Sequence, residues 1–302
     1  MTVDKTEPNS KTSKVWFITG ASRGLGAEIA QAALLSGDRV VATARSRQAL
    51  NSRLGADGDC LLSLSLDVSD AEQVKAAVAA AAGQYGGIDV LVNNAGYGHM
   101  GFFEELTPQD VQAQFATNLY GMMNVCWRIL PLMRSARRGH IFNLSSLAGL
   151  VGAQLGSIYC ASKFAVEGFS ESLSKEVAPF GVLVTIIEPG PFRTEFLTPR
   201  SFRFPDHPIP DYEQRRSQLR GGFEARNGQQ PGDPKKLANA ILDLANASRP
   251  PMRFLAGSVA LGAAEAKLNE LKNEIDQWRN VTLGTDGDFA SHSIGGLMDQ
   301  IK

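Results

Sequence analysis

The sequence predicts an α/β protein built on one open, doubly wound parallel sheet. Short apolar or β-branched runs alternate with segments in which apolar residues recur every three or four positions. This alternation is typical of strand–helix–strand units, whose strands lie parallel. The runs are apolar at successive positions, which indicates helices on both faces of the sheet. Because crossovers between parallel strands are right-handed, we expect an open sheet of about seven strands in a single domain.

Each expected element follows from this pattern. The predicted strands, in chain order, are Val15–Thr19, Arg39–Thr43, Leu61–Leu66, Ile88–Asn93, His140–Leu144, Val182–Ile187 and Met252–Leu255. The predicted helices between them are Leu25–Leu35, Ala71–Gln84, Val111–Met133, Ser157–Val177 and Pro234–Ala245. Together these elements lie within residues 14–256, and we expect this range to form one domain.

Two regions interrupt the alternation. Residues 195–233 are rich in Pro, Arg and Gly and contain scattered aromatic residues. An insertion of this length is more typical of a lid or binding loop than of a linker, and we call it the lid segment. Residues 257–302 form a predicted C-terminal helical extension, in which Leu261, Ala264, Leu268, Leu271, Ile275 and Trp278 recur every three or four positions. We expect that stripe to pack on its own domain, the alternatives being a dimer contact or a wall of the substrate pocket.

Composition excludes several classes of protein. Of 302 residues, 43% are hydrophobic, and 30 Lys and Arg balance 31 Asp and Glu to a net charge of −1. The chain therefore has enough apolar residues for a core and lacks the basic surplus of a nucleic-acid binder. No apolar run is long enough for a membrane span, and residues 1–13 read as a disordered lead-in rather than a secretory signal. Three scattered cysteines favour neither disulfides nor a metal site, so a cytoplasmic location is expected.

A glycine-rich turn follows the first predicted strand. Residues 19–26 read Thr-Gly-Ala-Ser-Arg-Gly-Leu-Gly and lead into the first helix. Glycines at Gly20, Gly24 and Gly26 let a pyrophosphate approach the backbone, where the helix N-terminus offers N–H groups. A plain strand–helix turn is the alternative, but the position between an apolar strand and an amphipathic helix favours a phosphate loop.

The end of the second strand bears on the choice of cofactor. NAD-binding units place an acid there, about 20 residues after the glycines, to bind the ribose 2′-hydroxyl. This chain has Ala44 and Arg45 instead, and its nearest acid, Asp38, precedes the strand. A guanidinium suits a 2′-phosphate, and Arg23 could reach the same group. The sequence therefore predicts NADP rather than NAD, unless both arginines are merely solvated.

Polar residues follow several strands at the same edge of the sheet. Tyr159 and Lys163 lie four residues apart in a predicted helix, so their side chains share one face. A cation near a phenol lowers its pKa, which makes the pair a candidate general acid and base. Ser146, Asn94 and Asn118 follow other strands or lie on an adjacent helix, and ligands of open α/β sheets bind at this edge.

Taken together, these motifs resemble the short-chain dehydrogenase/reductase family, over about residues 14–256. The resemblance implies a Rossmann-type fold in which Tyr159 is the proton donor or acceptor. It implies that Lys163 lowers the pKa of Tyr159 and holds the nicotinamide ribose. It further implies that Ser146 orients the carbonyl and that Asn118 keeps a water chain. It places the pyrophosphate against Gly20, Ser22, Gly24, Leu25 and Gly26, the adenine against Asp67 and Val68, the adenosine side against Asn94, Ala95 and Gly96, and the nicotinamide under Pro189, Gly190, Phe192 and Thr194. Arg23 and Arg45 complete the expected NADP site.

The family resemblance implies hydride transfer between a nicotinamide and a ketone, aldehyde or secondary alcohol. The segment from Tyr159 to Gly168 is similar to that of hydroxysteroid and retinol dehydrogenases, and aromatic residues of the lid segment favour a hydrophobic small molecule. A homodimer or homotetramer through the helices 111–133 and 157–177 is expected, with no nucleic-acid, membrane or metal partner. The alternatives are a non-enzymatic nucleotide sensor on the same fold, or an epimerase or dehydratase that retains its cofactor.

Overall fold

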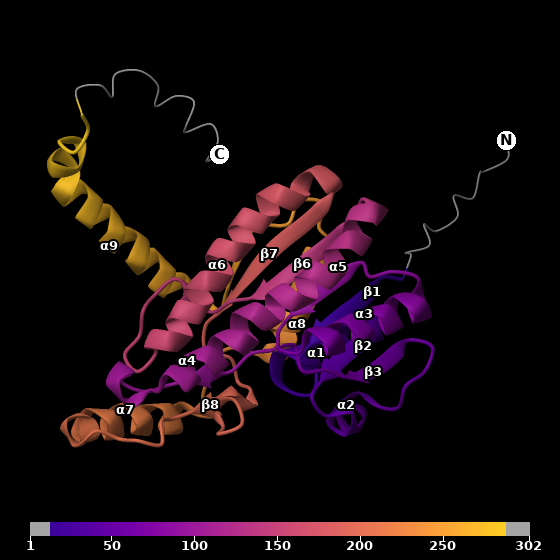
Figure 1. Cartoon of the computed structure of the whole chain (residues 1–302), viewed down its shortest axis with the longest axis horizontal. Helices are drawn as coiled ribbons and strands as arrows, with labels where there is room; N and C mark the ends of the chain where they lie inside the picture. Colours follow the sequence, from indigo (N-terminus) through magenta and orange to yellow (C-terminus); the bar gives the residue numbers. More distant parts are fainter. Residues whose placement is uncertain (1–12, 288–302) are drawn as a thin grey trace, which may run out of the picture.

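Seven parallel strands form one twisted sheet in the computed structural model of the chain, which describes residues 13–287 (Figure 1). The strands are β1 (Val15–Thr19), β2 (Arg39–Ala44), β3 (Leu61–Ser65), β4 (Val90–Asn93), β6 (Gly139–Leu144), β7 (Val182–Pro189) and β9 (Arg253–Ala256), in the spatial order β3-β2-β1-β4-β6-β7-β9. This order confirms the predicted doubly wound α/β fold. Because the strand order reverses between the parallel neighbours β1 and β4, a crevice is expected at their carboxyl ends. The lead-in predicted over residues 1–13 lies almost wholly outside the described residues.

Helices cover both faces of the sheet and build two hydrophobic cores. The helices α1 (Gly24–Leu35), α2 (Arg47–Leu54) and α8 (Pro234–Asn246) pack on one face, with Ile29, Leu50 and Ile241 fully buried there. The helices α3 (Ala71–Tyr85), α5 (Met122–Ala136) and α6 (Ser157–Val177) pack on the other face through residues such as Val74, Val125 and Val166. The two-sided burial explains why the strands are apolar at successive positions.

The long helix predicted over Val111–Met133 is interrupted. Its path consists of α4 (Pro108–Phe115), a π-helical turn at Ala116–Gly121 and then α5. The π turn carries Asn118, whose buried side chain bonds to the neighbouring loop rather than to its own helix. Single π turns inside helices are typical of functional sites. They cannot be predicted from the spacing of apolar residues, so the sequence indicates one uninterrupted helix.

Helix α2 has no counterpart among the helices predicted from the sequence. Ser46 caps it by accepting a hydrogen bond from the backbone N–H of Ala49, and only Leu50 is buried. With only Leu50 and the partly buried Leu54 packed on the core, the helix is too short to show an apolar stripe, and its cap is the clearest local signal.

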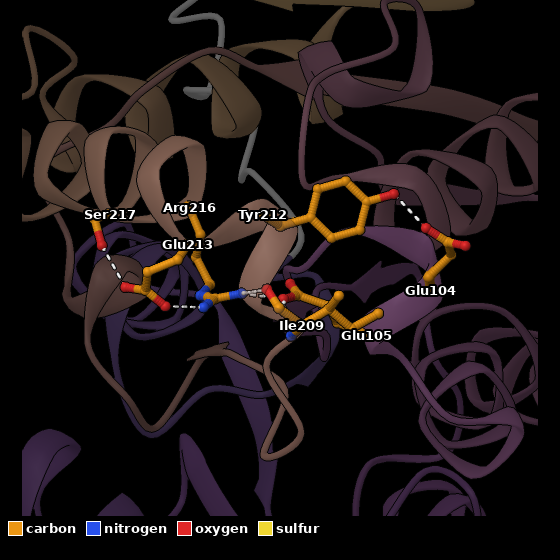
Figure 2. A network of polar contacts seen from close by, with 7 residues as sticks. All are labelled: Glu104, Glu105, Ile209, Tyr212, Glu213, Arg216 and Ser217. Atoms are coloured by element: carbon orange, nitrogen blue, oxygen red, sulfur yellow. Dashed lines mark hydrogen bonds and ion pairs between the residues drawn. The ribbon is translucent and has the colours of Figure 1, made fainter.

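The lid segment is folded. After a 3₁₀ turn (Glu195–Leu197), strand β8 (Phe202–Arg203) pairs with β5 (Gly98–His99), and helix α7 (Glu213–Arg226) follows. Figure 2 shows how α7 is anchored: Arg216 forms an ion pair with Glu105, whose side chain is fully buried, and Tyr212 bonds to Glu104. Glu105 also accepts a hydrogen bond from the backbone N–H of Ile209 at 2.9 Å. Arg216 is therefore an internal anchor rather than part of a solvated basic face.

The C-terminal helix α9 (Ser258–Leu283) projects away from the sheet (Figure 1). Only Ala260 and Ala264 of this helix are buried, whereas Leu268, Ile275 and Trp278 are 67%, 61% and 58% exposed. The expectation that the apolar stripe packs on its own domain is therefore wrong for the described residues. Within residues 13–287, no helix is long and apolar enough to cross a membrane.

Candidate active site

A cavity of about 980 Å³ opens at the carboxyl ends of the strands. Its wall contains most of the predicted site residues: Gly20, Ser22, Arg23, Gly24, Leu25, Arg45, Asp67, Val68, Asn94, Ala95, Gly96, Ser146, Tyr159, Lys163, Pro189, Gly190, Phe192 and Thr194. Gly26 and Asn118 do not line it. The fold thus brings residues from seven separate segments of the chain to one cleft, as expected for a ligand site at a switch point of the sheet.

The turn between β1 and α1 has the conformation that its glycines permit. Gly20 and Gly24 have φ of 67° and 55°, in the left-handed region that glycine adopts without strain. The Asn94 amide holds the turn by donating to the backbone oxygens of Thr19 and Gly20 at 2.9 and 3.0 Å. The Thr19 hydroxyl oxygen in turn accepts from the backbone N–H groups of Asn94 and Ala95. The loops after β1 and β4 are therefore locked together, and the N-terminus of α1 faces the cavity.

Arginines dominate the cavity at the end of β2. Arg45 is exposed, and Arg23 donates to the Ser201 hydroxyl of the lid segment at 2.7 Å. Burial and the positive charges of Arg200 and Arg45 lower the pKa of Arg23. Asp38, the nearest acid, instead accepts a hydrogen bond from the indole of Trp16 at 2.9 Å in the core. No carboxylate of the cavity wall follows β2, so this end presents positive charge.

Asp67 and Val68 line the wall after β3. The Asp67 carboxylate accepts from the backbone N–H and the hydroxyl of Ser69, at 2.9 and 2.6 Å. Val68 is buried, and its carbonyl accepts from the Asn124 amide at 3.1 Å. These contacts fix the loop that borders one side of the cavity.

Tyr159, Lys163 and Ser146 meet at the opposite end of the cavity. Tyr159 and Lys163 lie on α6, and Ser146 follows β6, where its hydroxyl accepts from the backbone N–H of Ala148 at 3.1 Å. The Lys163 ammonium donates to the Leu144 carbonyl at 2.7 Å and lies 6.0 Å from the centre of the Tyr159 ring. One phenol, one ammonium and one hydroxyl thus share a confined volume.

Burial governs the protonation of this group. It raises the pKa of Tyr159 to about 12, although hydrogen bonding to Ser146 lowers it in part. It lowers the pKa of Lys163 to about 8, against the opposing charge of Glu167. Burial therefore raises the pKa of Tyr159 overall, and the lowering that the sequence predicts from Lys163 stays a prediction.

Asn118 does not line the cavity, but it bonds to two elements that do. Its amide nitrogen donates to the Tyr97 carbonyl at 3.0 Å and to the Ser162 hydroxyl at 3.1 Å, and its oxygen accepts from the backbone N–H of Tyr97. Ser162 donates to the Tyr159 carbonyl at 2.7 Å. Asn118 therefore connects the loop after β4 to the helix that carries Tyr159 and Lys163.

The segment at and after the end of β7 lines the cavity. Gly190 donates its backbone N–H to Ala256 at 3.0 Å, and the Thr194 hydroxyl accepts from the backbone N–H of Phe196 at 3.3 Å. Phe192 packs on Gly232, where an added Cβ would lie 2.7 Å from its ring. These contacts hold the segment Pro189–Thr194 in the cavity wall, where Thr194 lies next to the phosphate loop: a Cβ added to Gly24 would stand 3.7 Å from the Thr194 Cβ.

The lid segment contributes residues that the sequence analysis did not assign to the site. Arg200, Ser201 and Arg203 of this segment line the cavity, as does Tyr97 of the loop after β4. Phe196 lies 6.1 Å from the Tyr159 ring, centre to centre, and packs in a small apolar cluster with Phe202, Leu155 and Met100. The aromatic residues of the lid segment predict a hydrophobic pocket. The pairing of β8 with β5 could not be predicted, because strands of two residues are too short to show a sequence pattern.

Comparison with known proteins agrees with this geometry. Residues 14–202 match the family model described as short chain dehydrogenase. Relatives include an oxidoreductase (BOA17) of Botryotinia fuckeliana, 38% identical over 90% of this chain and 99% of its own, and a 3-ketodihydrosphingosine reductase of Bacteroides thetaiotaomicron, 38% identical over 81% and 88%. Human retinol dehydrogenase 8 is 39% identical over 60% of this chain and 59% of its own.

Solved structures share the fold. A short-chain dehydrogenase from Streptomyces avermitilis superposes with a TM-score of 0.83, at 38% identity over 92% of this chain and all of that one. A Burkholderia phymatum enzyme in complex with NAD (TM-score 0.76, 25% identity, 87% and 95% covered) and a metagenomic oxidoreductase in complex with NADP (TM-score 0.63, 29% identity, 80% and 96% covered) are also similar. The chain belongs to the short-chain dehydrogenase/reductase family, and it is an oxidoreductase of that family.

Proposed function

We propose that this protein is an NADP(H)-dependent oxidoreductase that transfers hydride between the nicotinamide and a ketone, aldehyde or secondary alcohol of hydrophobic character. The observation that carries the proposal is the division of one cavity into two ends. Arg45 follows β2 and Arg23 lies between β1 and α1. Ser146 follows β6, two strands beyond β1 in the sheet, and Tyr159 and Lys163 line the same cavity, with Phe196 of the lid segment next to Tyr159.

The charge of the cavity supports NADP over NAD. An NAD site needs an acceptor for the ribose 2′-hydroxyl, and the residues after β2 supply Ala44 and Arg45 instead. Guanidinium groups are donors only, and they suit a phosphate. The related structures hold either cofactor, so this proposal depends on the residues of this chain.

Three side chains are suited to the chemical step. The bound nicotinamide supplies or accepts the hydride. The Ser146 hydroxyl and the Tyr159 phenol can both donate to an oxygen on which negative charge grows, the kind of preorganised stabilisation such a step requires. Since burial keeps the phenol of Tyr159 protonated, it holds the proton that a carbonyl oxygen needs. Lys163 holds a positive charge close to the phenol, and it would also bind the nicotinamide ribose.

Apolar residues around Tyr159 support a hydrophobic substrate. Phe196, Phe202 and Leu155 form part of an apolar cluster that extends from Tyr159. Two relatives bear names that refer to apolar substrates, a 3-ketodihydrosphingosine reductase and a retinol dehydrogenase. We therefore propose a lipid-like carbonyl compound or alcohol as the substrate class.

Exposed aromatic residues support the proposal of a homodimer or homotetramer. Trp127 of α5 is 70% exposed and Phe164 of α6 is 47% exposed, and both lie on the helices that the family resemblance assigns to subunit contacts. Light scattering coupled to size exclusion tests this: Trp127→Glu should reduce the measured mass if α5 forms the contact.

Calorimetric titration with NADPH and NADH tests the cofactor assignment. The wild type should bind NADPH at least tenfold more tightly, and Arg45→Asp should abolish or reverse that preference. Arg47→Asp is the matched control, because Arg47 is exposed, pairs with Asp57 and does not line the cavity. Equal or tighter binding of NADH to the wild type would refute NADP specificity, and absence of binding by both would refute a nicotinamide enzyme.

Turnover of a carbonyl panel with NADPH tests the catalytic assignment. Tyr159→Phe should lower kcat about 10²- to 10⁴-fold, the usual contribution of a general acid, with NADPH affinity within twofold of wild type. An active Tyr159→Phe enzyme would contradict the role of the phenol. Cofactor binding without net turnover of any carbonyl or alcohol would instead favour a sensor, or an epimerase or dehydratase that retains its cofactor.

A further inference from the structure

Strand β8 of the lid segment presents its two residues to different surroundings. Successive side chains of a strand point to opposite sides. Phe202 is buried in the apolar cluster, where its ring lies 6.1 Å from Phe196 and 4.9 Å from Phe223. Arg203 is exposed, lines the cavity and stacks on Tyr97 at 4.8 Å. One short strand therefore forms part of the apolar wall and part of the charged wall.

The charged wall has an excess of positive groups. Five cationic side chains line the cavity, namely Arg23, Arg45, Lys163, Arg200 and Arg203, against two carboxylates, Asp67 and Glu195. Arg200 and Arg45 are close enough to Arg23 to lower its pKa. Arg203 and Arg45 are both close enough to Tyr97 for their positive charges to lower its pKa, in opposition to burial. Four arginines from three segments of the chain thus line one part of the cavity, and an anion there would relieve their mutual repulsion.

A direct bond already ties the lid segment to the phosphate loop. The Arg23 guanidinium donates to the Ser201 hydroxyl at 2.7 Å and to the Arg200 carbonyl at 3.3 Å. The pairing of β8 with β5 places the same segment beside the loop after β4, through bonds of 2.8 Å from Gly98 to Ser201 and from Met100 to Arg203. Arg200 and Arg203 are therefore held at the cavity by backbone contacts on both sides.

We propose that Arg200 and Arg203 of the lid segment complete, with Arg23 and Arg45, a binding site for a phosphomonoester dianion, the 2′-phosphate of the dinucleotide. This inference rests on the proposed NADP specificity and extends it to the lid segment. Because Phe202 is adjacent to Arg203 on β8, binding of the phosphate by Arg203 would also hold Phe202 and the apolar wall near Tyr159 in place. Coupling of this kind is reciprocal, so the 2′-phosphate and an apolar ligand should strengthen one another's binding.

Adenosine 2′,5′-bisphosphate and adenosine 5′-monophosphate provide the test, because they differ only in the 2′-phosphate. Calorimetry should show that the wild type binds the bisphosphate at least tenfold more tightly. The Arg200→Gln/Arg203→Gln double variant should lose most of that difference and keep its affinity for the monophosphate. Arg215→Gln is the matched control, since Arg215 lies on the same lid segment, bonds to Gln154 and does not line the cavity.

The outcomes separate this inference from the proposed function. If the wild type discriminates between the two nucleotides, and Arg45→Asp abolishes the discrimination while the double lid variant retains it, the role of Arg200 and Arg203 is refuted and NADP specificity stands. If the wild type does not discriminate, NADP specificity fails and the inference with it. Arg203→Lys keeps the charge and should retain more of the preference than Arg203→Gln, which separates charge from a folding defect.

Hydrogen exchange tests the coupling. The bisphosphate should slow exchange across residues 195–226 of the wild type, whereas the monophosphate should not, and the double variant should show no such difference. Equal protection by the two nucleotides in the wild type would contradict a lid segment that responds to the phosphate.

Discussion

The side chain of Asn94 occupies the space in which a side chain at residue 26 would lie. A Cβ added to Gly26 would stand 2.4 Å from the Asn94 amide nitrogen and 2.5 Å from the Gly20 carbonyl oxygen. The same amide nitrogen donates to the carbonyl oxygens of Thr19 and Gly20. Gly26 is therefore required by the packing between the phosphate loop and the loop after β4, although it does not line the cavity.

Gly26→Ala should destabilise the protein and weaken dinucleotide binding. Neither the Gly20 backbone nor the bonded Asn94 amide can move without disturbing the loop, and overpacking of this kind costs about 1–3 kcal/mol. Urea unfolding and calorimetric titration with NADPH measure the two effects. Gly83→Ala is the control: Gly83 lies inside α3 with no atom near an added Cβ, so the change should stabilise the protein by up to about 1 kcal/mol. Equal effects of the two substitutions would contradict the steric argument.

His140 should make the protein sensitive to acid. Its ring is buried in β6, bonds through Nε2 to the Thr185 hydroxyl at 2.9 Å and contacts Phe142, and burial lowers its pKa to about 3. Between pH 6.5 and 3 the unfolded chain therefore binds a proton at this residue that the folded protein does not. Stability should then fall as the pH decreases through this range, by about 1.4 kcal/mol per pH unit.

Comparison with His140→Gln isolates this contribution from other titrating groups. Urea unfolding at pH 7 and pH 5 should show a smaller loss of stability for the variant than for the wild type, by about 2 kcal/mol. Identical pH dependence of the two proteins would mean that His140 does not stay neutral in the folded state.

Most of the sheet and of the reactive end could be predicted from the sequence, because strong local patterns specify them. The fully buried strand Val15–Thr19 is apolar up to its last residue, and the helix Ser157–Val177 has the same bounds in the structure as in the prediction. Tyr159, Lys163 and Ser146 were assigned to one edge because parallel strands place their carboxyl ends together.

What the sequence did not predict depends on contacts between distant residues. Arg200 and Arg203 reach the cavity only because β8 pairs with β5, a hundred residues earlier in the chain. Burial sets the pKa of Tyr159, and the Lys163 ammonium bonds to the Leu144 carbonyl; neither fact follows from the spacing of these residues in the sequence. The stripe on α9 has the period of a packed helix, but the period does not say which surface covers it.

Substitution on the exposed stripe of α9 should change the stability of the domain little. Ile275 is 61% exposed, so Ile275→Ala should change the free energy of unfolding by less than about 0.5 kcal/mol. Ile241→Ala in α8, where the side chain is fully buried, should cost about 2–5 kcal/mol. Denaturant unfolding at several protein concentrations measures both. A cost for Ile275→Ala that approaches that of Ile241→Ala would mean that another surface covers the stripe in solution.

Loss of the Arg216–Glu105 ion pair should release the lid segment. The Glu105 side chain is fully buried and Arg216 is 11% exposed, so Arg216→Gln would leave a carboxylate buried without its counter-charge, a change that costs about 3–5 kcal/mol. Because α7 makes few other contacts with the sheet, we expect the lid segment to open before the domain unfolds. Hydrogen exchange and limited proteolysis within residues 205–230 should then increase, and the KM of an apolar substrate should rise while the affinity for adenosine 5′-monophosphate stays the same.

Two further variants distinguish a lost charge pair from a lost contact. Arg215→Gln removes an exposed arginine from the same helix and should have little effect. Arg216→Met with Glu105→Leu replaces the pair with apolar side chains and should restore protection of the lid segment, because a buried ion pair and a packed apolar pair have similar stability. If Arg216→Gln leaves exchange within residues 205–230 unchanged, the lid segment is held by other contacts, and the aromatic cluster around Phe202 becomes the principal anchor.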